Sequence, residues 1–400
     1  WPLCHIAHVR PVFRSSDWKQ YVVINERFAR AVQEEAKTDN PVVLVQDYHF
    51  ALLPKMIRER LPNATIIAFW HIPWPNAESY GICPWRDEIL EGLLGGNILG
   101  FHTRLHCNNF VDSIDRFLEA RIDRNASTIS YGGKLTAVNH YPISIEWPLR
   151  GIQDRGSISA CRACVREIHA LKPECLIGVG VDRLDYTKGI LERFLAVERL
   201  LELQPEWIGK FSFVQIAAPS RSIIDQYQQY ASQVDTLAEN INKRFGHAGY
   251  QPIHLTNEHL EHPDVFTYYR GADVCIVSSL HDGMNLVAKE FVAARDDAQG
   301  VLILSQFTGA SYELPEALVV NPYNIDQCAA ALHLALRMPP EEQRRRMRSM
   351  RGYIQEFNVY RWAGRMLLDA ARMRQRQHVV RQVTRSDAVA RSENKGKRLP

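Results

Sequence analysis

Short runs of β-branched and other apolar residues alternate along this chain with longer stretches whose apolar residues recur every three or four positions. The short runs predict strands buried on both faces, and the longer stretches, such as 25–35 and 51–60, predict helices. Strands that alternate with helices form a parallel sheet covered by helices. The sequence therefore predicts an α/β fold with strands over residues 41–45, 64–70, 97–101, 176–181, 211–216, 272–278 and 301–305.

The alternation pauses in a polar helical stretch that follows Gly151 and ends at Lys172-Pro173. We expect two domains, an N-terminal one over residues 1–172 and a C-terminal one over 173–374. The second domain ends in an Arg-rich helical stretch over 332–374, which proline should interrupt near residues 338–340.

The positive charge of the chain is concentrated at its C-terminal end. Seven basic and two acidic residues give residues 375–400 a charge of +5, so the rest of the chain carries −2 of the total of +3. We therefore expect a disordered basic tail over 375–400 and a nearly neutral fold that does not bind nucleic acid.

The apolar runs and the cysteines limit further the class of protein to which this chain can belong. No run approaches the ~18 apolar residues of a membrane span, and the first residues lack the pattern of a signal peptide. The eight cysteines include one C-x-x-C pair, Cys161 and Cys164, whereas a zinc site would normally need a second pair. We expect reduced thiols in a cytoplasmic protein without a membrane partner.

Chemistry in an open α/β sheet is expected just beyond the carboxyl ends of its strands. The segment 182–189 after the fourth predicted strand carries Arg183 and Lys188, two cations that suit a diphosphate, in a loop closed by Gly189. The alternative is a solvated loop in which Arg183 pairs with Asp185. The spacing of the charges leaves both interpretations open.

The segment 279–290 follows the sixth predicted strand. Gly283 permits a sharp turn into a helix, whose free N–H groups would attract phosphate, and Glu290 could bind ribose hydroxyls. Alternatively, Asp282 only caps that helix and Glu290 faces solvent. The pattern alone slightly favours this second interpretation.

Two further polar segments follow strands in the first half, Gln46-Asp47-Tyr48-His49 and His71-Ile72-Pro73. A carboxylate and an imidazole there could bind sugar hydroxyls or serve as acid and base, although a single histidine at a strand end is more often structural. The sequence contains no nucleophile elbow, Walker loop or zincin motif.

Together these segments make the chain resemble the trehalose-6-phosphate synthase family of retaining glycosyltransferases, from Trp1 to about Trp362. The matching motifs occur in order and are long: DYH at 47–49, HIP at 71–73, GFHT at 100–103, YPI at 141–143, VDRLDYTKG at 181–189, QIA at 215–217, PSR at 219–221, DGMNLVAKE at 282–290, GVLILSQF at 300–307 and VNPY at 320–323.

The resemblance implies a GT-B type fold, in which two Rossmann-like domains face each other across a cleft and the C-terminal one binds a nucleotide-activated glucose, with UDP-glucose as the expected donor. It assigns Arg183 and Lys188 to the diphosphate leaving group, Asp282 to the glucose hydroxyls and Glu290 to the ribose. The donor-binding residues that it implies are Arg183, Lys188, Leu260, Asp282, Gly283, Met284, Asn285, Leu286, Val287, Ala288, Lys289 and Glu290.

On the acceptor side, the resemblance implies that Trp1, Asp47 and Arg221 bind glucose 6-phosphate. Asp47, His71, Arg183 and Lys188 are the implied catalytic residues, and no metal or other cofactor is implied. Because the chain opens on Trp1, we also expect that it lacks the N-terminal strand and Gly-rich loop of the family. The implied partners are small substrates, and a homo-oligomer is compatible with the family, as is a role in osmoprotection.

Two departures from the family pattern leave other activities open. His281 stands where many members have arginine, and residues 74–83 differ from the usual acceptor-side loop. The alternatives are a glucosylglycerol-phosphate synthase, which would use glycerol 3-phosphate as acceptor, and a catalytically silent protein that senses sugar phosphates. Retention of the leaving-group cations Arg183 and Lys188 argues against the silent protein.

Overall fold

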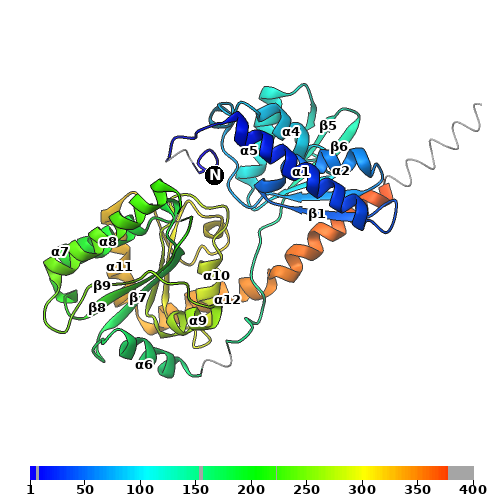
Figure 1. Ribbon diagram of the computed structural model, residues 1–400. Coiled ribbons are helices and arrows are strands. Elements are labelled where there is room, and N and C mark those ends of the chain that lie inside the picture. Colours follow the sequence, from blue (N-terminus) through cyan, green and yellow to red (C-terminus); the bar gives the residue numbers. More distant parts are fainter. Residues whose placement is uncertain (6–8, 153–155, 222, 377–400) are drawn as a thin grey trace, which may run out of the picture. The chain divides into compact units, whose positions relative to one another are not determined.

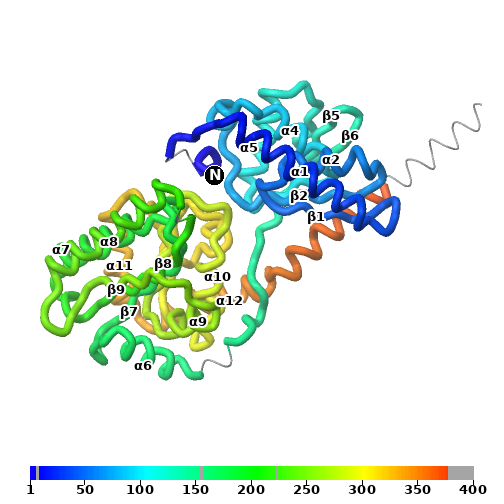
Figure 2. The backbone as a smooth tube through the Cα atoms, in the orientation of Figure 1, coloured from blue at the N-terminus to red at the C-terminus, as the bar shows by residue number. Residues whose placement is uncertain are grey.

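The computed structural model describes residues 1–5, 9–152, 156–221 and 223–376 (Figure 1). The predicted disordered tail thus lies, from residue 377 on, outside the described residues. The chain forms two compact units, one of Trp1–Tyr141 with Arg361–Pro400 and the other of Pro142–Tyr360. Figure 2 follows the chain from the first unit into the second and back through its last described helix, residues 359–376.

The first unit is built on a six-stranded sheet in the order β1-β2-β3-β6-β5-β4. The first four strands of this order run parallel, and β5 and β4 are antiparallel additions at one edge. Gly132 and Gly133, both at positive φ, make the two-residue turn between β5 and β6. The strands are β1 (Val42–Gln46), β2 (Thr65–Phe69), β3 (Ile98–Phe101), β4 (Arg121–Asp123), β5 (Thr128–Tyr131) and β6 (Lys134–His140).

Helices cover this sheet and bury strands such as β2, all five of whose residues are buried. The last described helix, residues 359–376, belongs mainly to this unit: Tyr141 donates a 2.9 Å hydrogen bond to Asp369, and Trp362 packs edge-on against Phe69. The other helices are α1 (Ser15–Glu35), η1 (Tyr48–Phe50), α2 (Leu53–Arg60), α3 (Ala77–Tyr80), α4 (Arg86–Leu93) and α5 (Arg104–Phe117).

The second unit contains a fully parallel six-stranded sheet in the order β12-β11-β10-β7-β8-β9. The central strand β10 and its neighbour β11 are buried at every residue, as their continuous apolar sequences predict. The strands are β7 (Leu176–Arg183), β8 (Phe211–Ala218), β9 (Ile253–Thr256), β10 (Val274–Val277), β11 (Val301–Ser305) and β12 (Leu318–Val320).

The connections of the second unit are helical. The predicted proline break is confirmed, since α11 ends at Arg337 and α12 begins at Pro340, although α11 begins earlier than expected. The helices are α6 (Ile158–Ile168), η3 (Tyr186–Lys188), α7 (Ile190–Leu203), η4 (Pro205–Trp207), α8 (Asp225–Phe245), α9 (His262–Gly271), α10 (Leu286–Ala294), η5 (Gly309–Tyr312), α11 (Ile325–Arg337) and α12 (Pro340–Glu356).

This division corrects the predicted domain boundaries in two respects. Helix α6 belongs to the second unit, because it packs closely on α9, where an added Cβ on Gly271 would lie 3.1 Å from Val165. Residues 361–374 belong to the first unit instead of closing the second. The seven predicted strands are all present, whereas β4, β5, β6, β9 and β12 were not predicted.

Two expectations from composition can be compared with the described residues. All eight cysteines lie in the described part of the chain, and none of them forms a disulfide. No helix in the described ranges is long and apolar enough to cross a membrane.

Candidate functional site

The loop after β7 is held in a fixed conformation by its own side chains. Asp185 accepts hydrogen bonds from the backbone N–H of Thr187, at 3.0 Å, and from its hydroxyl, at 2.8 Å, so it caps the turn η3 that presents Lys188. Gly189 follows at a φ of +64°, and a Cβ at this position would lie 2.1 Å from the carbonyl oxygen of Ser278. Glycine therefore lets the loop after β7 touch the loop after β10.

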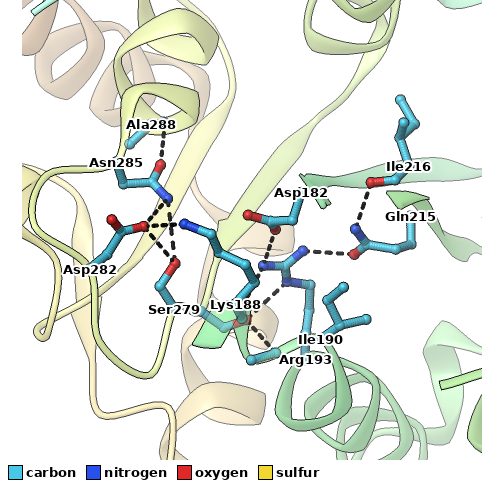
Figure 3. Close-up of polar contacts among 12 residues, drawn as sticks. Asp182, Lys188, Ile190, Arg193, Gln215, Ile216, Ser279, Asp282, Asn285 and Ala288 are labelled. Atoms are coloured by element: carbon cyan, nitrogen blue, oxygen red, sulfur yellow. Dashed lines mark hydrogen bonds and ion pairs between the residues drawn. The ribbon is translucent and has the colours of Figure 1, made fainter. Parts of the chain in front are cut away.

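Backbone and side-chain hydrogen bonds join these two loops. The N–H of Leu280 donates to the carbonyl of Thr187 at 2.8 Å, and the hydroxyl of Ser278 donates to the carbonyl of Gly189 at 2.7 Å. The ammonium of Lys188 then donates to Oδ2 of Asp282 at 2.6 Å (Figure 3). The structure thus brings together two residues that the sequence separates by more than ninety positions.

Asp282 has further polar neighbours. Its Oδ2 accepts from the Nδ2 of Asn285 at 3.2 Å and from the hydroxyl of Ser279 at 3.4 Å. Asn285, at a φ of +97°, caps helix α10 by accepting a 3.1 Å hydrogen bond from the N–H of Ala288. The cap of this helix is therefore Asn285, and Asp282 is left to pair with Lys188.

A buried arginine that sequence reasoning missed lies behind this pair. Arg193 of α7 is fully buried and donates to Asp182 at 2.8 Å, to Gln215 at 2.7 Å and to Ser278 at 3.0 Å (Figure 3). These partners lie on or beside β7, β8 and β10, so one guanidinium ties together the carboxyl ends of three adjacent strands. Only the acidic Asp182 on the preceding strand could have hinted at this role.

The buried charges of Lys188 and Asp182 shift each other's pKa in the direction opposite to the effect of burial. Burial lowers the pKa of Lys188, but Asp282 and Asp182 outweigh it and raise the pKa above its usual value. Burial also raises the pKa of Asp182, against the opposing effect of Arg193 and Lys188. Lys188 therefore stays a cation at neutral pH.

Arg183 is the second predicted cation of this loop. It ends β7 with an exposed side chain, and it forms no ion pair with any residue that the structure describes. The alternative pairing with Asp185 does not occur, because Asp185 instead accepts from Thr187 and, at 3.4 Å, from the hydroxyl of Tyr227. Arg183 is thus available to an anion at the same sheet edge as Lys188.

The helix α10 supplies the remaining donor-side residues. Leu286 and Val287 form its first turn, where backbone N–H groups lack partners within a helix. Glu290 is not solvent-facing as one interpretation had it: burial raises its pKa, and it accepts a hydrogen bond from Tyr269 at 3.3 Å.

The side chain of Lys289 is buried, although the resemblance implies that this residue binds the donor. Its ammonium is buried and donates to Glu313 at 2.6 Å and to the carbonyl of Ile143 at 2.7 Å, so its side chain is engaged inside the second unit. Met284 is buried in the same core, where its carbonyl accepts from Ala310, and the carbonyl of Gly283 lies close to Gly309. Leu260 is partly buried against this core.

In the first unit, Asp47 and His71 lie at the carboxyl ends of the neighbouring strands β1 and β2. Asp47 accepts a 3.0 Å hydrogen bond from the backbone N–H of His71, and its own backbone has a φ of +70°, which a residue other than glycine seldom adopts. The ring of His71 contacts the side-chain oxygen of Gln46 at 2.5 Å. Burial lowers the pKa of His71, and Asp47 opposes this effect.

The predicted acceptor residues fall in both units. Trp1 belongs to the first, where its ring lies 6.2 Å from that of Tyr48, next to Asp47. Arg221 belongs to the second, where its guanidinium donates to the hydroxyl of Tyr227 at 2.5 Å and packs over that ring. Tyr227 in turn contacts Asp185, so Arg221 is linked to the loop that carries Lys188.

The chemistry of the second unit suits a nucleotide diphosphate sugar. One sheet edge combines the cations Arg183 and Lys188, the start of helix α10 and the carboxylates of Asp282 and Glu290. Cations and helix N–H groups bind phosphate, and carboxylates accept hydrogen bonds from hydroxyls. Among the described residues, no group of three or more His, Cys, Asp or Glu side chains is arranged to hold a metal ion.

Comparison with known proteins gives consistent matches along the chain. The family described as glycosyltransferase family 20 matches residues 1–372. The trehalose-6-phosphate synthase of Mycolicibacterium vanbaalenii is 39% identical in an alignment 381 residues long, which covers 92% of this chain and 76% of that protein.

Solved structures of trehalose-phosphate synthases resemble this chain in fold over most of its length. The alpha,alpha-trehalose-phosphate synthase (UDP-forming) of Burkholderia xenovorans, in complex with glucose-6-phosphate, superimposes with a TM-score of 0.86 at 34% identity, over 93% of this chain and 82% of that one. The structure described as "Trehalose-6-phosphate from E. coli bound with UDP-2-fluoro glucose" gives a TM-score of 0.87 at 35% identity, over 92% and 81%.

Proposed function

The chain belongs to glycosyltransferase family 20, and from this premise we propose that it transfers glucose from UDP-glucose to glucose 6-phosphate, with retention of configuration, to form trehalose 6-phosphate. Family membership confirms the predicted enzyme class, a glycosyltransferase, and the predicted GT-B type of fold. The observation that carries the proposal is the placement of Arg183, Lys188 and Asp282 at one sheet edge beside the start of α10.

The proposed reaction breaks the bond between the anomeric carbon of glucose and the diphosphate. Positive charge develops on the sugar and negative charge on the departing diphosphate. Arg183, Lys188 and the first N–H groups of α10 would stabilise that anion more as the bond breaks, and such differential stabilisation lowers a barrier. Asp282 would hold the donor glucose through its hydroxyl groups, and Glu290 the ribose.

The first unit would supply the acceptor side. Asp47 would accept hydrogen bonds from sugar hydroxyls, and His71, whose pKa is lowered by burial, would present a neutral ring to the substrates. We propose a front-face route, in which the leaving phosphate oxygen takes the proton of the attacking hydroxyl. No side chain then acts as a nucleophile, and a glycosyl–enzyme adduct trapped on Asp47 or His71 would contradict this route.

Metal independence is part of the proposal. Two fixed cations and a helix start would supply the positive charge that a divalent ion supplies elsewhere. Turnover should therefore persist in excess EDTA after the protein has been stripped of metal. Recovery of activity only on adding Mg²⁺ or Mn²⁺ would reject this part.

Donor and acceptor identity are tested together by product analysis. Purified protein is offered UDP-, ADP- and GDP-glucose, each with glucose 6-phosphate or glycerol 3-phosphate, and products are identified by mass spectrometry. We expect trehalose 6-phosphate from UDP-glucose and glucose 6-phosphate. A glycerol-containing product would favour the glucosylglycerol-phosphate activity, and binding without turnover of any pair would favour a sugar-phosphate sensor.

A further inference from the structure

A cavity lies at the amino-terminal ends of strands β7, β8 and β9 in the second unit, whereas the donor residues follow the carboxyl ends of its strands. Its volume is about 340 Å³, and it is lined by residues that precede or begin strands β7, β8 and β9, such as Cys175, Ser212 and His254. Arg183 stands at the other end of β7, eight residues long, which corresponds to roughly 25 Å. The cavity is therefore separate from the proposed donor site.

The lining of this cavity is basic and polar. It contains Lys172 and the three histidines His169, His247 and His254, and no aspartate or glutamate is among its lining residues. His247 and Lys172 are exposed at the rim, whereas Ser212 and Tyr250 are buried in the wall. A lysine ammonium beside three imidazoles, with no carboxylate among the lining residues, favours an anionic occupant.

His169 and His254 form a close pair in this wall. Their ring centroids are 5.1 Å apart in an edge-to-face arrangement, and His169 contacts the hydroxyl of Tyr268 at 3.3 Å. The Nε2 of His254 is enclosed and has no hydrogen-bond partner among the described residues. Buried polar atoms are nearly always satisfied, so the unpaired Nε2 of His254 is an unusual feature of the wall beside this cavity.

Among the described residues, no carboxylate is a cause of the lowered pKa values of His169 and His254. The nearby carboxylates Glu258 and Asp264 act instead on Tyr268, which contacts His169. His169 follows α6, Tyr268 lies on α9, and His254 receives a further interaction from the backbone of Gln251. Near Cys175 in the same wall, the positive charge of Arg166 is opposed by the negative charge of Glu174. The remaining carboxylate there, Asp273, is paired with Arg162 at 2.6 Å. Burial and the positive charge of His169 lower the pKa of His254 to about 4. A bound anion would favour the protonated form of His254 and raise this pKa.

We propose that this cavity binds a small phosphate-type oxyanion, either inorganic phosphate or a phosphomonoester, with Lys172 and His247 at the rim and the His169–His254 pair in the wall. Lysine and histidine are ordinary ligands of phosphate, and the binding would draw a proton onto the histidine pair. This phosphate site contains none of the proposed donor-binding residues. Its test is therefore independent of the proposed glucosyl transfer.

The test uses NMR signals of the histidine rings, assigned through the His254→Gln and His169→Gln variants. Inorganic phosphate or glycerol 2-phosphate is titrated at pH 6, and the two probes distinguish a free ion from an ester. We expect a saturable change in the His169 and His254 signals and a rise of about one unit or more in the titration midpoint of His254, equivalent to a tenfold coupling.

Variants at the rim locate the site. Lys172 is exposed, so Lys172→Met should fold normally and lower phosphate affinity about tenfold or more. Lys243→Met, on the exposed face of α8, removes the same charge outside the cavity and should leave the affinity unchanged. Ring signals that phosphate does not move, or an affinity that Lys172→Met does not change, would overturn the proposal.

Discussion

The ammonium of Lys188 lies 2.6 Å from Oδ2 of Asp282, which joins the loop after β7 to the loop after β10. Both residues are proposed to bind the donor, one its diphosphate and the other its glucose. The pair therefore places in direct contact a cation and a carboxylate that both have a proposed role toward the donor.

Replacing Lys188 tests the leaving-group role. Lys188→Met should lower kcat by about 10²–10³-fold with a smaller effect on KM, because the cation acts mainly as the bond breaks. Steady-state kinetics with UDP-glucose measure this split. Lys243→Met, which removes an exposed cation of α8, is the matched control; equal loss in both variants, or a change in KM alone, would contradict the role.

Replacing Asp282 tests the opposed roles of the pair. In Asp282→Asn the sugar contact loses its charge, so kcat/KM for UDP-glucose should fall roughly ten- to a hundredfold. UDP alone should bind at least as tightly as before, because Lys188 no longer has a carboxylate partner. Calorimetric titration of UDP checks this, with Asp225→Asn at the exposed start of α8 as control. Parallel weakening of UDP and UDP-glucose would show that Asp282 only maintains the fold.

Gly189 should tolerate no side chain. Gly189→Ala would place a Cβ 2.1 Å from the carbonyl of Ser278 at a φ of +64°, so we expect a loss of stability of at least about 1 kcal/mol and of most activity. Gly352→Ala, where a Cβ in α12 meets nothing within 4 Å, should instead stabilise by about 0.5–1 kcal/mol. Urea unfolding of both variants measures the contrast, and equal stabilities would refute the proposed packing of the two loops.

The lowered pKa of His254 should make the stability of the protein depend on pH. Its pKa is lowered from 6.5 to about 4 by burial, so the folded state binds fewer protons than the unfolded state between these values. The free energy of unfolding should therefore fall as the pH drops from 6.5 toward 4, by up to about 3 kcal/mol from this group. His254→Gln should flatten that decrease in urea-unfolding curves, and an identical pH dependence of the variant would contradict the assignment.

Sequence patterns predicted much of the fold because buried parallel strands are continuous apolar runs. The five missed strands lack that signal: β4 and β5 carry exposed or polar residues, and β12 has only three residues. Their place depends on pairing with neighbours, which periodicity along the chain does not reveal.

The candidate site shows the same limit. Lys188 and Asp282 could be found because each follows a predicted strand, but their direct contact depends on how two loops meet around Gly189. Arg193 was missed because an arginine within a helix is usually solvated, and only the fold shows its burial against Asp182. The burial of Lys289 against Glu313 was likewise not readable from its position in the motif.

The bond that this protein makes distinguishes retaining glucosyl transfer from other reactions most directly. Purified protein would be incubated with UDP-glucose labelled with ¹³C at the anomeric carbon and with glucose 6-phosphate, and followed by NMR. We predict stoichiometric release of UDP and a labelled α-linked carbon in trehalose 6-phosphate, formed without a detectable intermediate on the enzyme. A β-linked product, or release of free glucose with no transfer to the acceptor, would contradict the proposed retaining glucosyl transfer.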